Sequence, residues 1–147
     1  MGVVVDALVE VDNDMMGGTT VTTPRPTATP VPTPELVRVA GGERHSLALW
    51  SNGTVVAWGD CPREGVLAVP AGLQATAIAA GGDHSLALKA NGEVVAWGDN
   101  YNGQCDVPAG LRATAISAGR CHSLALKANG EVVAWGDNYY GQCDVPP

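Results

Sequence analysis

The chain has 147 residues, a formal net charge of −7 and 19 glycines but no phenylalanine. A net anion is not attracted to nucleic-acid phosphates or acidic lipid headgroups, so we expect no nucleic-acid binding. The sequence contains no run of 18 apolar residues, which excludes an ordinary transmembrane helix, and we expect no membrane insertion. Its apolar residues are mostly Ala, Val and Leu, which favours short strands with tight turns.

Residues 1–16 are predicted to form an N-terminal β segment. Four valines occupy odd positions, while Asp6 and Glu10 occupy even ones, a pattern typical of a half-buried strand. The valines at odd positions are Val3, Val5, Val9 and Val11. Such a strand can add to the edge of a neighbouring copy's sheet. We therefore expect this segment to act in self-assembly, giving a homo-oligomer or polymer.

Residues 17–35 have the composition of a Pro/Thr-rich linker. Proline at every second or third position does not fit a sheet interior and favours an extended spacer. Threonines beside prolines are also typical of O-glycosylated stalks, which predicts an extracellular or cell-surface location. The N-terminus carries no signal-peptide pattern, so any export signal would have to lie outside this sequence.

The rest of the chain, residues 36–147, consists of three repeats, 36–70, 71–108 and 109–147. The stretch from 75 to 108 recurs at 113 to 146 with only four differences. Markers keep the same period: His45, His84 and His122 are separated by 39 and 38 residues. Self-similarity at a fixed period of this length indicates a propeller, a solenoid or another repeat array.

Each repeat is predicted to contain four short strands. In the second repeat these are 76–80, 84–89, 94–97 and an outer segment around Asp106 and Val107. Asn91-Gly92 predicts a two-residue type I′ hairpin between the second and third strands. Four-stranded units in series are typical of β-propeller blades. The predicted fold is therefore all-β, with three blades that form a partial propeller, an open stack or a propeller completed by other copies.

The repeats also resemble a known family. The string G-x-x-H-S-L-A-L-x-x-x-G-x-V-x-x-W-G-x-N-x-x-G-Q, at 81–104 and again at 119–142, is similar to the regulator of chromosome condensation repeat. The VPAGL connectors are similar to those of bacterial members, among them the propeller-type β-lactamase inhibitory protein. The resemblance implies a propeller that acts by binding a protein, and in the bacterial case by inhibiting an enzyme.

The copies differ mainly in two loops, which the strand order places at the same edge of each blade. Constant strands with one variable rim are how many repeat proteins carry a binding face. Tyrosines in such loops supply rigid contact area. The alternative is neutral drift after a recent duplication. The predicted partner-binding residues are Arg44, Asp83, Tyr101, Asn102, Arg120, Tyr139 and Tyr140.

Four cysteines permit three complete disulfide pairings, and small unbridged thiols are the alternative. They are Cys61, Cys105, Cys121 and Cys143. No carboxylate recurs beside all three histidines, so we expect no metal and no cofactor. We expect each histidine to bind a nearby loop, and the recurring tryptophans to fill the space between blades.

No nucleophile elbow, P-loop or paired-carboxylate motif is present, which predicts that the protein is not an enzyme and has no catalytic residues. The favoured function is a non-catalytic extracellular scaffold, structural or protein-binding, whose partner is another copy or an unidentified target. The alternative is an inhibitor or regulator of an enzyme that binds through the rim. A guanine nucleotide exchange factor is the third hypothesis.

Overall fold

A computed structural model describes residues 11–13, 19–21, 30–63 and 65–147. The chain divides into two compact units, Met1–Pro34 and Glu35–Pro147. All regular secondary structure of the described residues is β. No helix in this part of the chain is long and apolar enough to cross a membrane.

The N-terminal unit contains a small antiparallel pair, β1 (Val11–Asn13) and β2 (Thr19–Val21). β2 lies inside the stretch that the composition predicts to be a linker. Its residues are β-branched and precede the first proline of the stretch, so nothing in them opposes pairing. Of the predicted assembly strand, Val11 pairs with Val21, whereas Val3, Val5 and Val9 lie outside the described residues.

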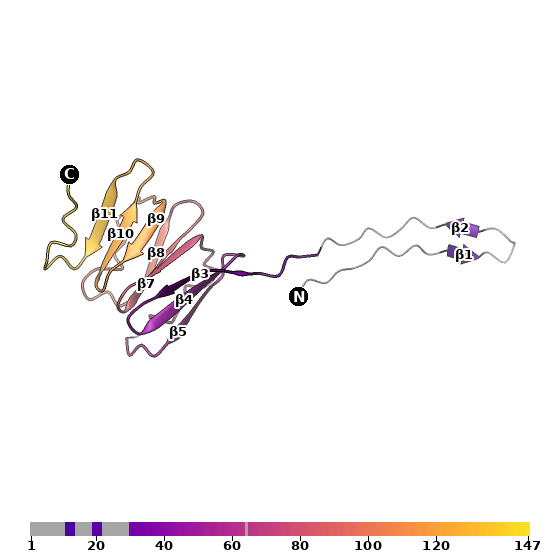
Figure 1. Cartoon of the computed structure of the whole chain (residues 1–147), viewed down its shortest axis with the longest axis horizontal. Helices are drawn as coiled ribbons and strands as arrows, with labels where there is room; N and C mark the ends of the chain where they lie inside the picture. Colours follow the sequence, from indigo (N-terminus) through magenta and orange to yellow (C-terminus); the bar gives the residue numbers. More distant parts are fainter. Residues whose placement is uncertain (1–10, 14–18, 22–29, 64) are drawn as a thin grey trace. The chain divides into compact units, whose positions relative to one another are not determined.

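The C-terminal unit is built from three antiparallel meanders, each with its second strand at the centre. The first sheet contains β3 (Leu36–Gly41), β4 (His45–Trp50) and β5 (Val55–Gly59). The second contains β6 (Ala77–Ala80), β7 (His84–Leu88) and β8 (Val94–Gly98). The third contains β9 (Ala115–Ala118), β10 (His122–Leu126) and β11 (Val132–Gly136). Figure 1 shows the sheets side by side, like consecutive blades.

The predicted fourth strand is not a strand in this structure. The segment after β8 forms turns, in which the amides of Gly103, Asp106 and Val107 bind carbonyls at most three residues back. The side-chain oxygen of Asn100 accepts a further hydrogen bond from the amide of Cys105, at 2.8 Å. Because these amides are satisfied within the loop, they are not available to pair with β8.

The hairpin prediction was right about the position and wrong about the turn type. A type I′ turn needs positive φ at both central residues, but Asn91 does not have it and Gly92 does, at 85°. The amide of Gly92 binds the carbonyl of Lys89, and Lys89 pairs again with Glu93. This is a three-residue loop that ends in a left-handed glycine. The Asn91 side chain accepts the Glu93 amide at 3.0 Å, which favours this form.

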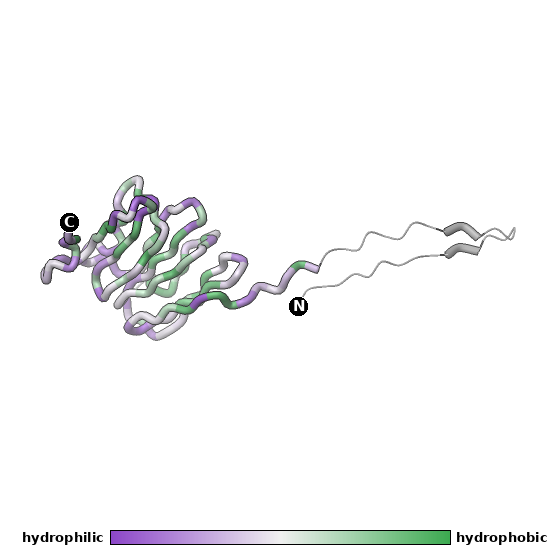
Figure 2. Tube along the Cα trace, turned by 45° about the horizontal axis from the view of Figure 1, so that its top comes forward, coloured by the Kyte–Doolittle hydropathy of each residue, from purple (hydrophilic) through white to green (hydrophobic). Residues whose placement is uncertain are grey.

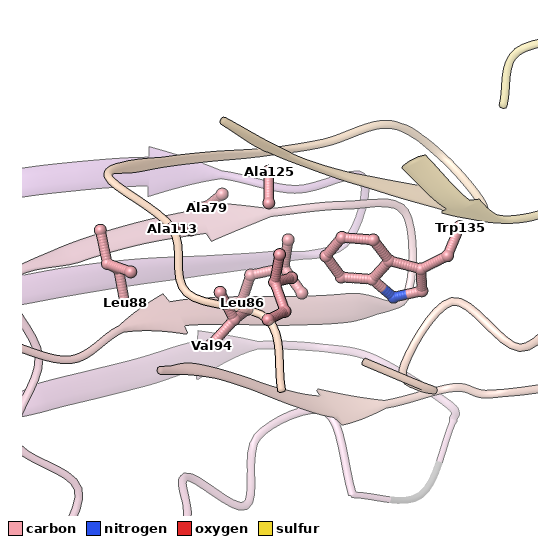
Figure 3. Packing of buried hydrophobic residues seen from close by; sticks show 8 residues of the cluster. Ala79, Leu86, Leu88, Val94, Ala113, Ala125 and Trp135 are labelled. Atoms are coloured by element: carbon pink, nitrogen blue, oxygen red, sulfur yellow. The ribbon is translucent and has the colours of Figure 1, made fainter. Parts of the chain in front are cut away.

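The hydrophobic core lies between consecutive sheets. Side chains alternate along β7, so that Leu86 and Leu88 pack in the cluster shared with the third sheet, while Ala87 packs in the cluster shared with the first. Figure 3 shows Leu86 between Trp135 and Leu88 in the cluster of the second and third sheets. In Figure 2 hydrophobic residues follow the strands and hydrophilic residues gather in the loops. Each sheet is therefore stabilised mainly by its neighbour.

Candidate protein-binding rim

The loops after the first and third strands of each sheet meet at one edge of the C-terminal unit, which we call the rim. The loops after β5, β6, β8 and β9 line a hollow of about 120 Å³. Its lining residues are Arg63, Gly82, Asp83, Asp99, Tyr101, Asn102, Arg120 and Cys121. This volume is well below the several hundred Å³ of a typical small-molecule site. The hollow has room for one side chain of a partner rather than for a metabolite.

The carboxylates around the hollow already have partners. Arg63 lies 4.0 Å from a carboxylate oxygen of Asp83 and 3.7 Å from one of Asp99. Asp99 also accepts a hydrogen bond from the Gln104 side chain at 3.0 Å. Arg120, in the third repeat, pairs with Glu43, in the first repeat, at 3.3 Å. These exposed pairs contribute little stability, but they hold alternating charges in place around the hollow.

The loop that carries Tyr101 is fixed by its own polar side chains. Asn100 donates to Asp106 at 2.8 Å, and Gln104, itself buried, accepts the amide of Asn102 at 2.9 Å. The Tyr101 ring is 88% exposed above this support. A ring presented by an ordered loop loses little conformational entropy on binding. Tyr101 is therefore preorganised for contact with another molecule.

The structure brings together four of the seven residues predicted for the rim. Asp83, Tyr101, Asn102 and Arg120 line the hollow, whereas Arg44 does not. Tyr139 and Tyr140 form a separate pair in the third repeat, with ring centroids 4.8 Å apart and an edge-to-face arrangement. Both rings are highly exposed.

Sequence reasoning missed Arg63 and the role of Asp99 at the hollow. Arg63 lies in the one loop that departs from the repeat, so comparison of the copies gave no equivalent for it. An aspartate follows Trp-Gly in each repeat, and Asp99 accepts a hydrogen bond from the Gln104 side chain of its own loop. Its proximity to Arg63 depends on how two sheets pack, which the repeat pattern does not show.

Below the rim, polar groups cross each junction between sheets. His45 Nε2 lies 2.9 Å from Ser85 Oγ, and His84 Nε2 lies 3.0 Å from Ser123 Oγ. The expectation that each histidine binds a nearby loop was therefore wrong for these two, because each binds the serine of the following sheet. The signal was present, since serine follows the recurring histidine in all three repeats.

The tryptophans make a second set of bonds across the junctions. Trp97 Nε1 donates to the carbonyl of Val66 at 3.1 Å, and Trp135 Nε1 donates to the carbonyl of Gln104 at 2.9 Å. Both rings are buried, as expected for residues between blades. Trp58, in the first sheet, is 50% exposed, so the expectation fails there. No sheet precedes it in the C-terminal unit.

The glycine of the G-x-x-H motif makes this packing possible. A Cβ on Gly81 would overlap the His84 ring and would stand 2.6 Å from the carbonyl oxygen of Gly119 in the next sheet. Only a residue without a side chain lets the imidazole and the neighbouring backbone approach so closely. The motif therefore belongs to the junction between sheets rather than to the rim.

Burial lowers the pKa of both junction histidines. The pKa of His84 falls to about 4, first because of burial and then because of the nearby His45 and His122. Burial likewise lowers the pKa of His45. Both rings are therefore neutral at neutral pH.

All four cysteines are free thiols, so none of the predicted disulfide pairings is formed in this structure. The thiols of Cys61, Cys105 and Cys143 instead donate to oxygens of aspartates. Burial, together with Asp99 and Asp106, raises the pKa of Cys105 to about 11. In the described part of the chain, no three His, Cys, Asp or Glu side chains are grouped so as to hold a metal ion.

Two segments of the C-terminal unit match a known family of repeats. The model described as the regulator of chromosome condensation (RCC1) repeat matches residues 75–104 and 113–142. The chain carries two RCC1 repeats. Residues 36–70 contain the first sheet, which has the same strand order and lies outside those two matches. No curated protein sequence matches the chain.

Solved structures with the same architecture are similar to the C-terminal unit. Prp20p from Saccharomyces cerevisiae, whose binding to Gsp1p and histones has been described, is 30% identical with a TM-score of 0.65. The match covers 77% of this chain and 33% of Prp20p. The same yeast RCC1 has been crystallised with Kap60 bound.

A plant protein shows the same likeness. The ectodomain of the receptor kinase CR4 from Physcomitrella patens is 29% identical with a TM-score of 0.63, over 74% of this chain and 31% of that one. The chain thus spans about a third of the length of these structures. Its three sheets resemble blades of an RCC1 propeller.

Proposed function

We propose that the protein is a non-catalytic scaffold that binds another protein through the rim. The observation that carries the proposal is the hollow beside Tyr101, in which residues from three repeats converge. An exposed, preorganised aromatic ring next to paired charges is the usual composition of a protein-binding hot spot. The carboxylates at the hollow are engaged by arginine and glutamine side chains, which favours a recognition role over acid–base chemistry.

The likeness to yeast RCC1 supports a protein as the partner, since that relative binds Gsp1p, histones and Kap60. A rim of mixed charge on a chain of net charge −7 agrees with this class of partner. If the partner is an enzyme, the rim would act as the inhibitor or regulator predicted from the bacterial resemblance. The hollow favours that alternative because it fits one inserted side chain. Nucleotide exchange is the least favoured hypothesis, because the chain spans only a third of Prp20p.

The test compares three immobilised proteins: the wild type, the rim variant Tyr101→Ala/Arg120→Ala, and Arg112→Ala. Arg112 is a matched control, an exposed arginine whose guanidinium binds only the adjacent Leu111 carbonyl among the described residues. Each immobilised protein is exposed to an extract of the cells in which this protein occurs naturally, and the retained proteins are identified by mass spectrometry. We expect one protein to be retained by the wild type and Arg112→Ala but lost from the rim variant.

Equal retention by all three proteins would contradict the proposal. Circular dichroism checks that the rim variant is folded, which is expected because both substituted side chains lie outside the core clusters. The inhibitor alternative is then tested on the retained partner. If that partner is an enzyme, its activity should fall when the wild type is added and should not change with the rim variant.

A further inference from the structure

The two junctions inside the C-terminal unit are built to one pattern. The earlier sheet contributes a histidine, a leucine face and a loop carbonyl, while the later sheet contributes a serine and a tryptophan. At the second junction these are His84, Leu88 and Gln104 against Ser123 and Trp135. The pattern divides a junction into a leucine half and a tryptophan half, which are complementary to each other.

The β9–β11 sheet ends the unit with an uncovered leucine half. Leu126 and Val132 are each 39% exposed, whereas the equivalent Leu88 and Val94 are 6% and 5% exposed. Together with Ile116 and Leu124 they line a hollow with a mostly apolar surface. His122 and the carbonyl of Gln142 stand at the repeat positions of His84 and Gln104.

The β3–β5 sheet ends the unit with an uncovered tryptophan half. Trp58 is 50% exposed, against 8% for both Trp97 and Trp135. Val56 on the same strand and Val39 on β3, at the other edge of the sheet, are also exposed. Ser46 stands at the repeat position of Ser85, which receives His45 at the first junction.

We propose that a second copy of this chain covers these two end faces, head to tail. The leucine half of one copy would receive the tryptophan half of the other, with Trp58 in the place of Trp135 and Ser46 in the place of Ser123. The two end faces carry the same two halves that pack together at the internal junctions. A second copy therefore presents the chemistry that each exposed face is built to receive. Interfaces between unlike faces close into a ring when the rotation permits it.

Two copies would bring six sheets together, within the range of four to eight blades found in closed propellers. Each copy would then use both of its end faces, and the assembly would be a dimer with two equivalent junctions. This proposal is independent of the rim, because the end faces and the rim share none of the residues that carry either argument. It also differs from self-assembly through the N-terminal strand.

Sedimentation velocity of the full chain over a wide range of concentrations tests the proposal. We expect the wild type to reach the mass of a dimer. Leu126→Lys and Trp58→Lys, one on each end face, should each raise the dissociation constant at least about 30-fold, the loss typical of a residue at the centre of an interface. The rim variant Tyr101→Ala/Arg120→Ala should dimerise like the wild type, which separates this proposal from the proposed function.

An equimolar mixture of the two end-face variants gives the sharpest result. Each variant keeps the face that the other has lost, so the mixture should form a heterodimer through one intact junction although neither variant dimerises alone. Circular dichroism confirms folding, and Val132→Lys replaces Leu126→Lys if the latter does not fold. A wild type that stays monomeric, variants that dimerise as tightly as the wild type, or a mixture that does not associate would each overturn the proposal.

Discussion

At the scale of single residues, the junction between the second and third sheets depends on a short hydrogen-bonded chain in an apolar core. Ser123 Oγ donates to the carbonyl of Gln104 at 2.8 Å, which commits its only proton. His84 must then donate from Nε2 to Ser123, and its Nδ1 is left without a partner. A proton added at Nδ1 would have no acceptor, which together with burial explains why the pKa of His84 is so low.

This low pKa predicts that the stability of the protein falls between pH 7 and pH 5. The unfolded chain binds a proton at His84 near pH 6.5, whereas the folded chain binds it only near pH 4. Lowering the pH in this range therefore favours the unfolded state, and the loss to pH 5 is about 2 kcal/mol at most. Urea unfolding at both pH values measures it. His84→Gln lacks this contribution, so an equal loss of stability in both proteins would contradict the prediction.

At the scale of elements, the hairpin between the second and third strands recurs almost unchanged in all three sheets. Gly53, Gly92 and Gly130 have φ values of 85°, 85° and 86°. In each repeat the preceding asparagine accepts the amide two residues ahead. The glycine supplies a backbone conformation that other residues adopt only with strain. The registers of β7 with β8 and of β10 with β11 depend on this turn.

Gly130 allows this strain to be measured without steric interference. A Cβ at this position would meet no atom within 4 Å, so Gly130→Ala changes only the backbone preference. We expect a loss of about 1 to 2 kcal/mol in the free energy of unfolding. Gly130→Asn is the matched control and should lose less, because asparagine tolerates the left-handed region better. Equal losses for alanine and asparagine would indicate another cause.

The strands were predictable because local chemistry specifies them. Serine and alanine alternate with leucine between Gly81-Gly82 and the asparagine turn, and the predicted strand 84–89 is observed as His84–Leu88. The absence of the predicted outer strand was not predictable, because it depends on side chains such as Asn100 that bind amides within the loop. Arg63 at the hollow depends on packing between repeats, which no single repeat encodes. An extracellular location and the absence of catalysis stay predictions.

At the scale of the whole C-terminal unit, the core is distributed between sheets rather than within them. Trp135 is 8% exposed and packs with Leu86 and Leu88 of the preceding sheet, whereas its equivalent Trp58 has no preceding sheet in this unit. The same tryptophan therefore stabilises the core where a sheet precedes it, as at Trp135, and contributes little burial where none does, as at Trp58.

Alanine substitution should separate these two roles. Trp135→Ala removes a buried ring and its bond to Gln104, so we expect a loss of about 3 to 5 kcal/mol. Trp58→Ala, measured in dilute protein so that copies do not associate, should cost about 1 kcal/mol or less, as is usual for partly exposed sites. Chemical denaturation of both variants gives the comparison. Similar losses would mean that burial between sheets does not control stability.

The tryptophan bonds also give the array a direction. Each one runs from a later sheet back to a loop of the sheet before it, so Gln104 is held by Trp135 and Val66 is held by Trp97. Each of these loop carbonyls is therefore bound by the sheet that follows it in the chain. During synthesis on the ribosome, the hydrogen bonds within the Tyr101 loop can form first, whereas the bond that Gln104 accepts from Trp135 can form only once the third repeat has emerged.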